Sequence, residues 1–130
     1  MADEAAEKAI CDGLTVFNES QAPGANWRAL SIYARDESGA VQGGLTGSSC
    51  YDWLFVKWLW VAEPFRSQGI GSRLLARAEE VARERNIGAV YLDTFTFQAP
   101  GFYEKHGYRE FGRLDDPVHG HARIWLAKRL

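Results

Sequence analysis

The apolar run from Trp53 to Val61 constrains most strongly what this chain can fold into. Only Lys57 interrupts it. A short continuous apolar run between turn signals is typical of a central strand that is buried on both faces. Pro64 ends the run, since proline cannot donate a hydrogen bond to a strand ladder. We therefore expect a sheet with this strand near its centre.

The segment from Gly69 to Arg85 is the clearest helix in the sequence. It has one apolar stripe and a charged opposite face, the pattern of an amphipathic helix. The stripe consists of Ile70, Leu74, Ala78, Val81 and Ala82. Asn86 and Gly88 end this helix, and a second apolar strand follows from Ala89 to Thr94.

The remaining segments complete the prediction of a mixed α/β domain. A first helix is expected from Asp3 to Ser20, where Ile10, Leu14 and Phe17 recur at helical spacing. The other expected elements are a hairpin from Arg28 to Leu45, a short helix from Ala99 to His106, and final strands at Tyr108–Leu114 and Ala122–Leu130. The length of 130 residues favours a single domain over residues 1–130. The many aromatic residues, among them Trp27, Trp53, Trp58, Trp60, Phe95 and Phe97, are expected mostly in the core.

Composition excludes several classes of protein. The net charge of −2 gives no basis for expecting nucleic acid or an anionic membrane as a partner. Cys11 and Cys50 form no C-x-x-C pattern, which fits a reducing compartment. The stretch from Met1 to Lys8 lacks the basic start and apolar core of a signal peptide, so we expect a cytoplasmic protein.

The turn between the first apolar strand and its helix has the composition of a phosphate-binding loop. A helix start leaves backbone N–H groups unpaired and carries positive partial charge. Gly69 and Gly71 let a phosphate approach those groups, while Arg66 and Arg73 add charge and Ser72 adds a hydroxyl. The loop lacks the lysine of a Walker motif, and Leu74 replaces the third glycine of a dinucleotide fingerprint. By itself the pattern R-x-x-G-x-G is equally compatible with an ordinary glycine-rich turn.

A second motif, from Gln98 to Tyr108, reads QAPGFYEKHGY. Together, the two motifs resemble the GNAT superfamily of acyl-CoA-dependent N-acetyltransferases, which pairs an [RQ]-x-x-G-x-[GA] loop with a downstream F/L-Y-E-K-x-G-[FY] segment. The resemblance covers at least Trp53 to Arg113. It implies an α/β (α+β) fold whose mixed, mostly antiparallel central sheet has two splayed parallel central strands and is flanked by helices.

The resemblance also implies a role for individual residues toward acetyl-CoA. Trp60 and Val61 would pair with the pantetheine arm, and Tyr103 would protonate the departing CoA thiolate, chemistry that a phenol with a pKa of about 10 can perform. The diphosphate would lie on the loop, which comprises Arg66, Ser67, Gln68, Gly69, Ile70, Gly71 and Ser72. Gln98, Phe102 and Lys105 are expected to line the CoA channel.

Two departures from the family pattern affect the acceptor side. Many members carry an asparagine where this chain has Thr96, which leaves Gln98 to replace it, and the family's first strand is not recognisable. Asp93 is the favoured general base for the amine, with Glu63, His119 and His121 as the other candidates. A cap or salt-bridge partner is the alternative for Asp93. The H-x-H spacing of the two histidines has no further ligand at fitting spacing, so no metal is expected.

The implied activity is transfer of an acetyl group from acetyl-CoA to a primary amine of a small molecule or protein by direct attack. Two alternatives remain: an acyl-CoA-binding sensor without activity, and a toxin that acetylates charged tRNA. The intact Tyr103 favours catalysis, and the acidic balance disfavours RNA. Family members often form homodimers, and the aromatic-rich composition is compatible with one. The acceptor amine stays unidentified.

Overall fold

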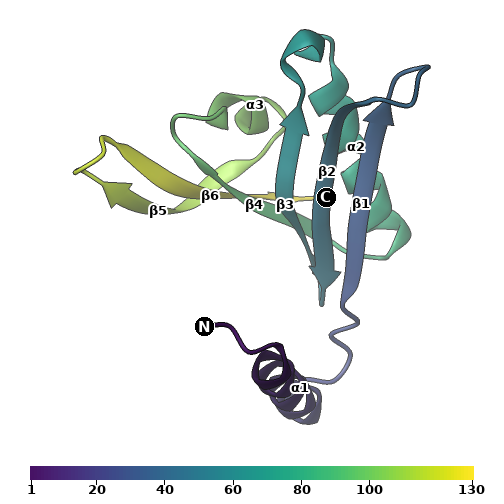
Figure 1. The fold of residues 1–130 in the computed structure, drawn as a ribbon, viewed down its shortest axis with the longest axis vertical. Coiled ribbons are helices and arrows are strands. Elements are labelled where there is room, and N and C mark those ends of the chain that lie inside the picture. The colour runs from purple at the N-terminus through teal and green to yellow at the C-terminus, as the bar shows by residue number, and fades with distance from the viewer.

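The computed structural model describes all residues from 1 to 130 and contains one six-stranded sheet in the order β1-β2-β3-β4-β6-β5 (Figure 1). Only β3 and β4 run parallel, and all other neighbours are antiparallel. The elements are α1 (Glu4–Gln21), β1 (Arg28–Arg35), β2 (Val41–Cys50), β3 (Trp53–Val61), the short 3-10 helix η1 (Glu63–Phe65), α2 (Ile70–Glu84), β4 (Ala89–Phe95), α3 (Pro100–Lys105), β5 (Arg109–Asp116) and β6 (His121–Arg129). The predicted elements and the mixed fold class are confirmed. None of the helices is long and apolar enough to cross a membrane.

Helix α2 covers one face of the sheet and forms the core with it. Its buried residues include the predicted stripe, with Leu75 and Glu79 in addition. On the sheet, the buried side chains of this face come from β1 to β4 and β6, and they are Leu30, Leu45, Leu54, Val56, Val90, Leu92, Ile124 and Leu126. Arg85 holds the end of α2 to the sheet, because its guanidinium donates to the Ser49 hydroxyl and the Ala29 carbonyl oxygen, each at 2.9 Å.

No helix of the same chain covers the opposite face, which we call the open sheet face. It carries Tyr33, Trp53, Phe55, Trp58, Trp60, Tyr91 and Trp125, the residues that alternate with the buried ones. Trp58 is 65% exposed and Trp60 is 56% exposed. The prediction that β3 is buried on both faces is therefore wrong for its second half. The expectation that most aromatic residues lie in the core is also wrong, since Trp27 and Phe97 are exposed as well.

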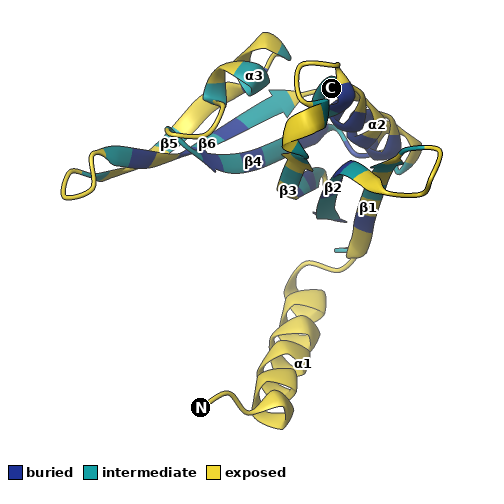
Figure 2. Cartoon of the chain, turned by 45° about the horizontal axis from the view of Figure 1, so that its top comes forward, coloured by how far each residue is buried: buried dark blue, intermediate teal, exposed yellow.

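Helix α1 projects from the body of the molecule, and every one of its residues is exposed (Figures 1 and 2). The Asp3 carboxylate accepts a hydrogen bond from the Ala6 amide and caps the helix start. The predicted apolar stripe is present, but it contacts no core. The strand that the family places before its first helix does not precede α1.

The pairing of β3 with its neighbours changes at Lys57. Gly47 pairs with Val56 and Thr46 pairs with Trp58, so Lys57 is the extra residue of a β-bulge. A Cβ atom at Gly47 would lie 2.0 Å from the carbonyl oxygen of Phe55, a distance that no side chain tolerates. Glycine at this position is therefore a requirement of the strand pairing next to the bulge.

We predict that Gly47→Ala lowers the free energy of unfolding by about 2–3 kcal/mol, because the new methyl group forces the backbones of β2 and β3 apart. Urea denaturation measures this value. Gly13→Ala is the matched control, since its methyl group meets open space and alanine favours a helix. Equal stability of the Gly47→Ala variant and the parent would show that the strands accommodate the methyl group.

Candidate functional site

The parallel strands β3 and β4 pair at one end and separate at the other. Their pairing runs only from Trp53 with Ala89 to Val56 with Leu92. Beyond this point β3 continues beside β2 as far as Val61, whereas β4 continues beside β6 as far as Phe95. The sheet therefore opens between the carboxyl ends of two neighbouring strands, as the resemblance implied.

The predicted phosphate loop lies directly after the opened end of β3. The amides of Ser67, Gln68 and Gly69 donate to no acceptor in the chain, and the first three amides of α2 have no intrahelical partner. Ser67 and Gly69 adopt left-handed backbone conformations, with φ of 65° and 80°. No side chain caps the start of α2, and its first turn contains no acidic residue. The loop thus presents a row of free N–H groups at the positive end of a helix.

Helix α3 packs against the first turn of α2 and so encloses one side of the loop. A Cβ atom built on Gly71 lies 3.4 Å from the Phe102 ring and 3.8 Å from a methyl group of Val61. The Ser72 hydroxyl and the His106 Nε2 atom are hydrogen-bonded at 3.0 Å. The small residues Gly71 and Ser72 therefore let the start of α2 approach α3 closely. His106 is a residue of this site that the sequence did not reveal.

The sequence predicted that Arg66 and Arg73 both add positive charge to the phosphate loop, but the two side chains lie in different places. Arg66 Nε donates to the carbonyl oxygen of Val61 at 2.9 Å and so ties the loop to the end of β3. Arg73 is exposed and borders a hollow that Ile32 and Tyr33 of β1 also line. Trp60 lies on the open sheet face, so its side chain points away from α2.

Tyr103 of α3 is the residue with the clearest chemical signature. Its ring packs between the rings of Phe102 and Tyr108, with centroid distances of 5.1 and 6.2 Å, and its hydroxyl makes no hydrogen bond within the chain. Burial, followed by the negative charge of Asp93, raises the pKa of Tyr103 to about 12. The phenol therefore carries its proton throughout the neutral range and can donate it.

Asp93 is held by an arginine from the neighbouring strand. Arg123 of β6 donates from Nε to the Oδ1 atom of Asp93 at 2.9 Å, and its Nη2 atom lies 2.8 Å from the same oxygen in an ion pair. Asp93 is thus close enough to Tyr103 for its charge to raise the pKa of the phenol. It also has a salt-bridge partner, which is the role that the sequence offered as the alternative to a general base. Arg123 was missed because thirty positions separate the two residues, and only the antiparallel register of β4 and β6 reveals the contact.

Gln98 closes the end of β4. Its amide oxygen accepts from the Thr94 hydroxyl at 2.8 Å and from the Phe95 amide at 2.9 Å. This side chain is committed to the turn between β4 and α3, which keeps α3 at the opening of the sheet. Lys105, at the end of α3, and Glu63, in η1, are exposed.

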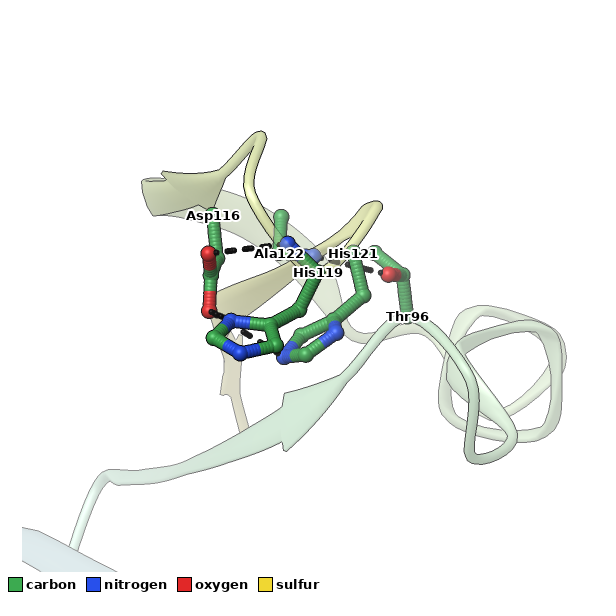
Figure 3. A network of polar contacts seen from close by, with 5 residues as sticks. All are labelled: Thr96, Asp116, His119, His121 and Ala122. Atoms are coloured by element: carbon green, nitrogen blue, oxygen red, sulfur yellow. Dashed lines mark hydrogen bonds and ion pairs between the residues drawn. The ribbon is translucent and has the colours of Figure 1, made fainter.

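The two histidines of the H-x-H pair belong to a polar network at the turn of the β5–β6 hairpin (Figure 3). His119 Nδ1 lies 2.8 Å from a carboxylate oxygen of Asp116, and His121 Nε2 lies 3.8 Å from the same oxygen. Thr96 joins this hairpin to the end of β4, since its hydroxyl accepts from the Ala122 amide at 3.0 Å. The network borders an open hollow of about 580 Å³, whose acidic side is formed by Asp115 and Asp116.

Comparison with known proteins gives one consistent result. The model of the acetyltransferase (GNAT) family matches residues 6–108. Acetyltransferase Atu2258 of Agrobacterium fabrum is 40% identical over 129 residues, which are 99% of this chain and 94% of that protein. The blasticidin-S acetyltransferase of Streptomyces morookaense is 43% identical over 108 residues, 79% of each chain.

Solved structures agree with these relatives. The crystal structure of a proposed acetyltransferase from Agrobacterium tumefaciens is 40% identical and has a TM-score of 0.93, covering 100% of this chain and 95% of the other. A proposed streptothricin acetyltransferase of Bacillus anthracis, solved in complex with acetyl coenzyme A, is 22% identical. Its TM-score is 0.69, over 78% of this chain and 62% of its own. At that identity the likeness concerns the fold alone.

The raised pKa of Tyr103 predicts that this residue does not ionise between about pH 9 and 11, the range in which a free phenol with a pKa of about 10 does so. Spectrophotometric titration at the phenolate band should therefore give the same amplitude over this range for the parent and for Tyr103→Phe. A variant amplitude lower by one tyrosine would contradict the burial and charge effects described above.

Proposed function

Because the chain belongs to the GNAT family of acetyltransferases, we propose that it transfers the acetyl group of acetyl-CoA to the amine of a small molecule. One observation carries this proposal: the opening between β3 and β4 has the free amides of the loop at one side and the protonated Tyr103 at the other. The ligand that this arrangement suits has a diphosphate at one end and a leaving group that needs a proton at the other.

The loop would hold the diphosphate of acetyl-CoA through the amides from Gln68 to Ser72. These groups are oriented before binding, and the helix N-terminus adds positive partial charge. Arg66 supports the site by fixing the loop to β3, since it donates to the Val61 carbonyl oxygen. The pantetheine arm would then extend along the edge of β3 that β4 leaves unpaired, near Trp60 and Val61, with Phe102 beside it.

The chemistry at the end of that arm is amine attack on the thioester carbonyl carbon. A C–N bond forms, the C–S bond breaks, and the electron pair of that bond leaves with sulfur as a thiolate. Tyr103 would give its proton to the thiolate as the C–S bond breaks, so that CoA leaves as a neutral thiol and the tyrosine is left as a phenolate. The proton that the attacking amine loses would pass to a base. Asp93 is the candidate, because its carboxylate is close enough to Tyr103 to raise the pKa of the phenol. Tyr103 would regain its proton from solvent.

A small amine is the acceptor class that the observations favour. The blasticidin-S acetyltransferase is a relative with 43% identity, and its named substrate is a small molecule. The hollow beside the end of β4 is lined by Asp115 and Asp116 and by Arg113, which forms an ion pair with Asp115. Asp116 is the carboxylate there that attracts a protonated amine. A screen of small amines would identify the acceptor.

Gly71→Glu tests the cofactor site. The carboxylate would lie at the Phe102 ring and repel the diphosphate, so we expect acetyl-CoA affinity to fall by about 100-fold or more, equivalent to about 2.7 kcal/mol. Isothermal titration calorimetry measures this loss. Thr15→Glu on the exposed α1 helix adds the same charge and should bind like the parent. If the parent does not bind acetyl-CoA, the proposed function is wrong.

Tyr103→Phe separates catalysis from binding. Because the variant keeps the ring but loses the proton, kcat should fall by about 100-fold or more while acetyl-CoA affinity stays unchanged. Thiol release in the presence of a panel of small amines gives the rate, and calorimetry gives the affinity. An unchanged kcat would remove Tyr103 from the mechanism. Binding of acetyl-CoA without turnover of any amine would favour the sensor over the enzyme.

A further inference from the structure

Helix α1 has an apolar face that nothing in its own chain covers. Ile10, Leu14 and Phe17 recur at i, i+4 and i+7 and share one side of the helix. They are 71%, 58% and 60% exposed. Glu4, Lys8 and Asp12 occupy the other side, so the helix is amphipathic. A helix of this pattern normally buries its apolar face against another surface.

The projecting position of α1 is fixed by hydrogen bonds at its base. The Tyr51 hydroxyl donates to the carbonyl oxygen of Ala22 at 2.6 Å, and the Tyr51 amide donates to that of Ala25 at 2.9 Å. The Glu19 carboxylate accepts from the amides of Gly24 and Ala25 at 3.2 and 3.3 Å. Folding of α1 back onto its own sheet would break these contacts. A covering surface that comes from outside the chain leaves these contacts intact.

The related crystal structure from Agrobacterium tumefaciens has the same feature. Residues 1–27, which contain α1, make up about a fifth of this chain. A TM-score of 0.93 over the whole chain requires that these residues superpose with the rest. The projecting helix is thus shared with a protein of 40% identity that was determined by crystallography.

The open sheet face provides a surface of matching chemistry. Tyr33 and Trp60 lie in one row across β1 to β3 with Gly44 between them, and Trp58 lies in the next row. Cationic groups stack on aromatic rings of this face: Lys57 on Trp58 at 4.6 Å, Arg35 on Tyr33 at 5.6 Å, Arg129 on Trp53 at 4.8 Å, and Arg123 on Trp125 at 5.0 Å.

The N-terminal segment that contains α1 (residues 1–21) and the rest of the chain (residues 22–130) have net charges of opposite sign. Residues 1–21 contain five acidic side chains and one basic side chain, a net charge of −4. Since the whole chain has a net charge of −2, residues 22–130 have +2. The acidic helix therefore meets a body of opposite net charge, and like charges do not oppose their contact.

We propose that two copies of this chain form a symmetric dimer in which each α1 packs its apolar side against the open sheet face of the partner. A two-fold arrangement uses the same pair of surfaces twice, so one self-complementary contact satisfies both copies. Each helix of 18 residues is about 27 Å long and about 10 Å wide. Two such helices, with the helix side and the sheet side of each contact counted, bury on the order of 1,000 Å², which is the lower bound for a specific interface. The proposal concerns assembly and does not rest on the proposed reaction.

Sedimentation velocity on the full chain tests this dimer with two matched double variants. Leu14→Asp/Phe17→Asp places two carboxylates on the apolar side of α1, and we expect a monomer. Ala5→Asp/Thr15→Asp places two carboxylates on the polar side, and we expect it to remain a dimer like the parent. Circular dichroism checks that α1 is still helical in both. A monomeric parent, or an apolar-side variant that is still a dimer, would overturn the proposal.

A mixing experiment identifies the receiving surface. Tyr33→Asp/Trp58→Asp alters only side chains that are more than half exposed, so the body should fold and the chain should be monomeric. Mixed with Leu14→Asp/Phe17→Asp, this sheet variant should form a weaker heterodimer, because its intact helix meets an intact sheet face on the other copy. A sheet variant that stays a dimer would show that the helices pair elsewhere. Two monomers that stay apart after mixing would exclude the exchange.

Discussion

The interrupted pairing of β3 and β4 is the constraint on which the rest of this structure depends. Four residue pairs hold the two parallel strands together, and beyond Val56 and Leu92 each strand follows a different neighbour. The bulge at Lys57 lies at the point where they separate, which is where bulges commonly redirect a strand. A continuous sheet would fill this space with backbone hydrogen bonds. The opening instead leaves one edge of β3 free and brings the loop before α2 and helix α3 to the same end of the sheet.

The opening matters chemically because its two sides have different electrostatic character. The start of α2 offers unpaired N–H groups with no acidic side chain nearby, so it favours an anion. On the side of α3, burial and the charge of Asp93 keep Tyr103 protonated. Arg123 forms an ion pair with that carboxylate. The proposed acyl transfer from a CoA thioester depends on both features, because its phosphate-bearing carrier leaves as a thiolate that needs a proton.

The two faces of the sheet are unequal, and this asymmetry links the fold to its assembly. Helix α2 supplies enough apolar surface to cover one face, while the aromatic residues of the other face are left with cations stacked on them. The same chain holds an amphipathic helix away from its own body through Tyr51 and Glu19. An uncovered sheet face and an uncovered helix in one molecule are complementary halves of a contact that two copies can complete together.

The sequence by itself determined the elements, their order and the glycine-rich loop before α2, because strand and helix patterns and the glycine positions are local properties. The Trp53–Val61 run, the stripe of α2 and the row from Arg66 to Ser72 all lie where their patterns predicted them. Only the tertiary structure decided which faces are buried and which side chains meet. An apolar run does not reveal that one sheet face lacks a helix, so the exposure of Trp58 and Trp60 was unforeseen. Likewise, Asp93 meets Arg123 and Ser72 meets His106 through strand register and helix packing, contacts between residues far apart in the chain that no local pattern encodes.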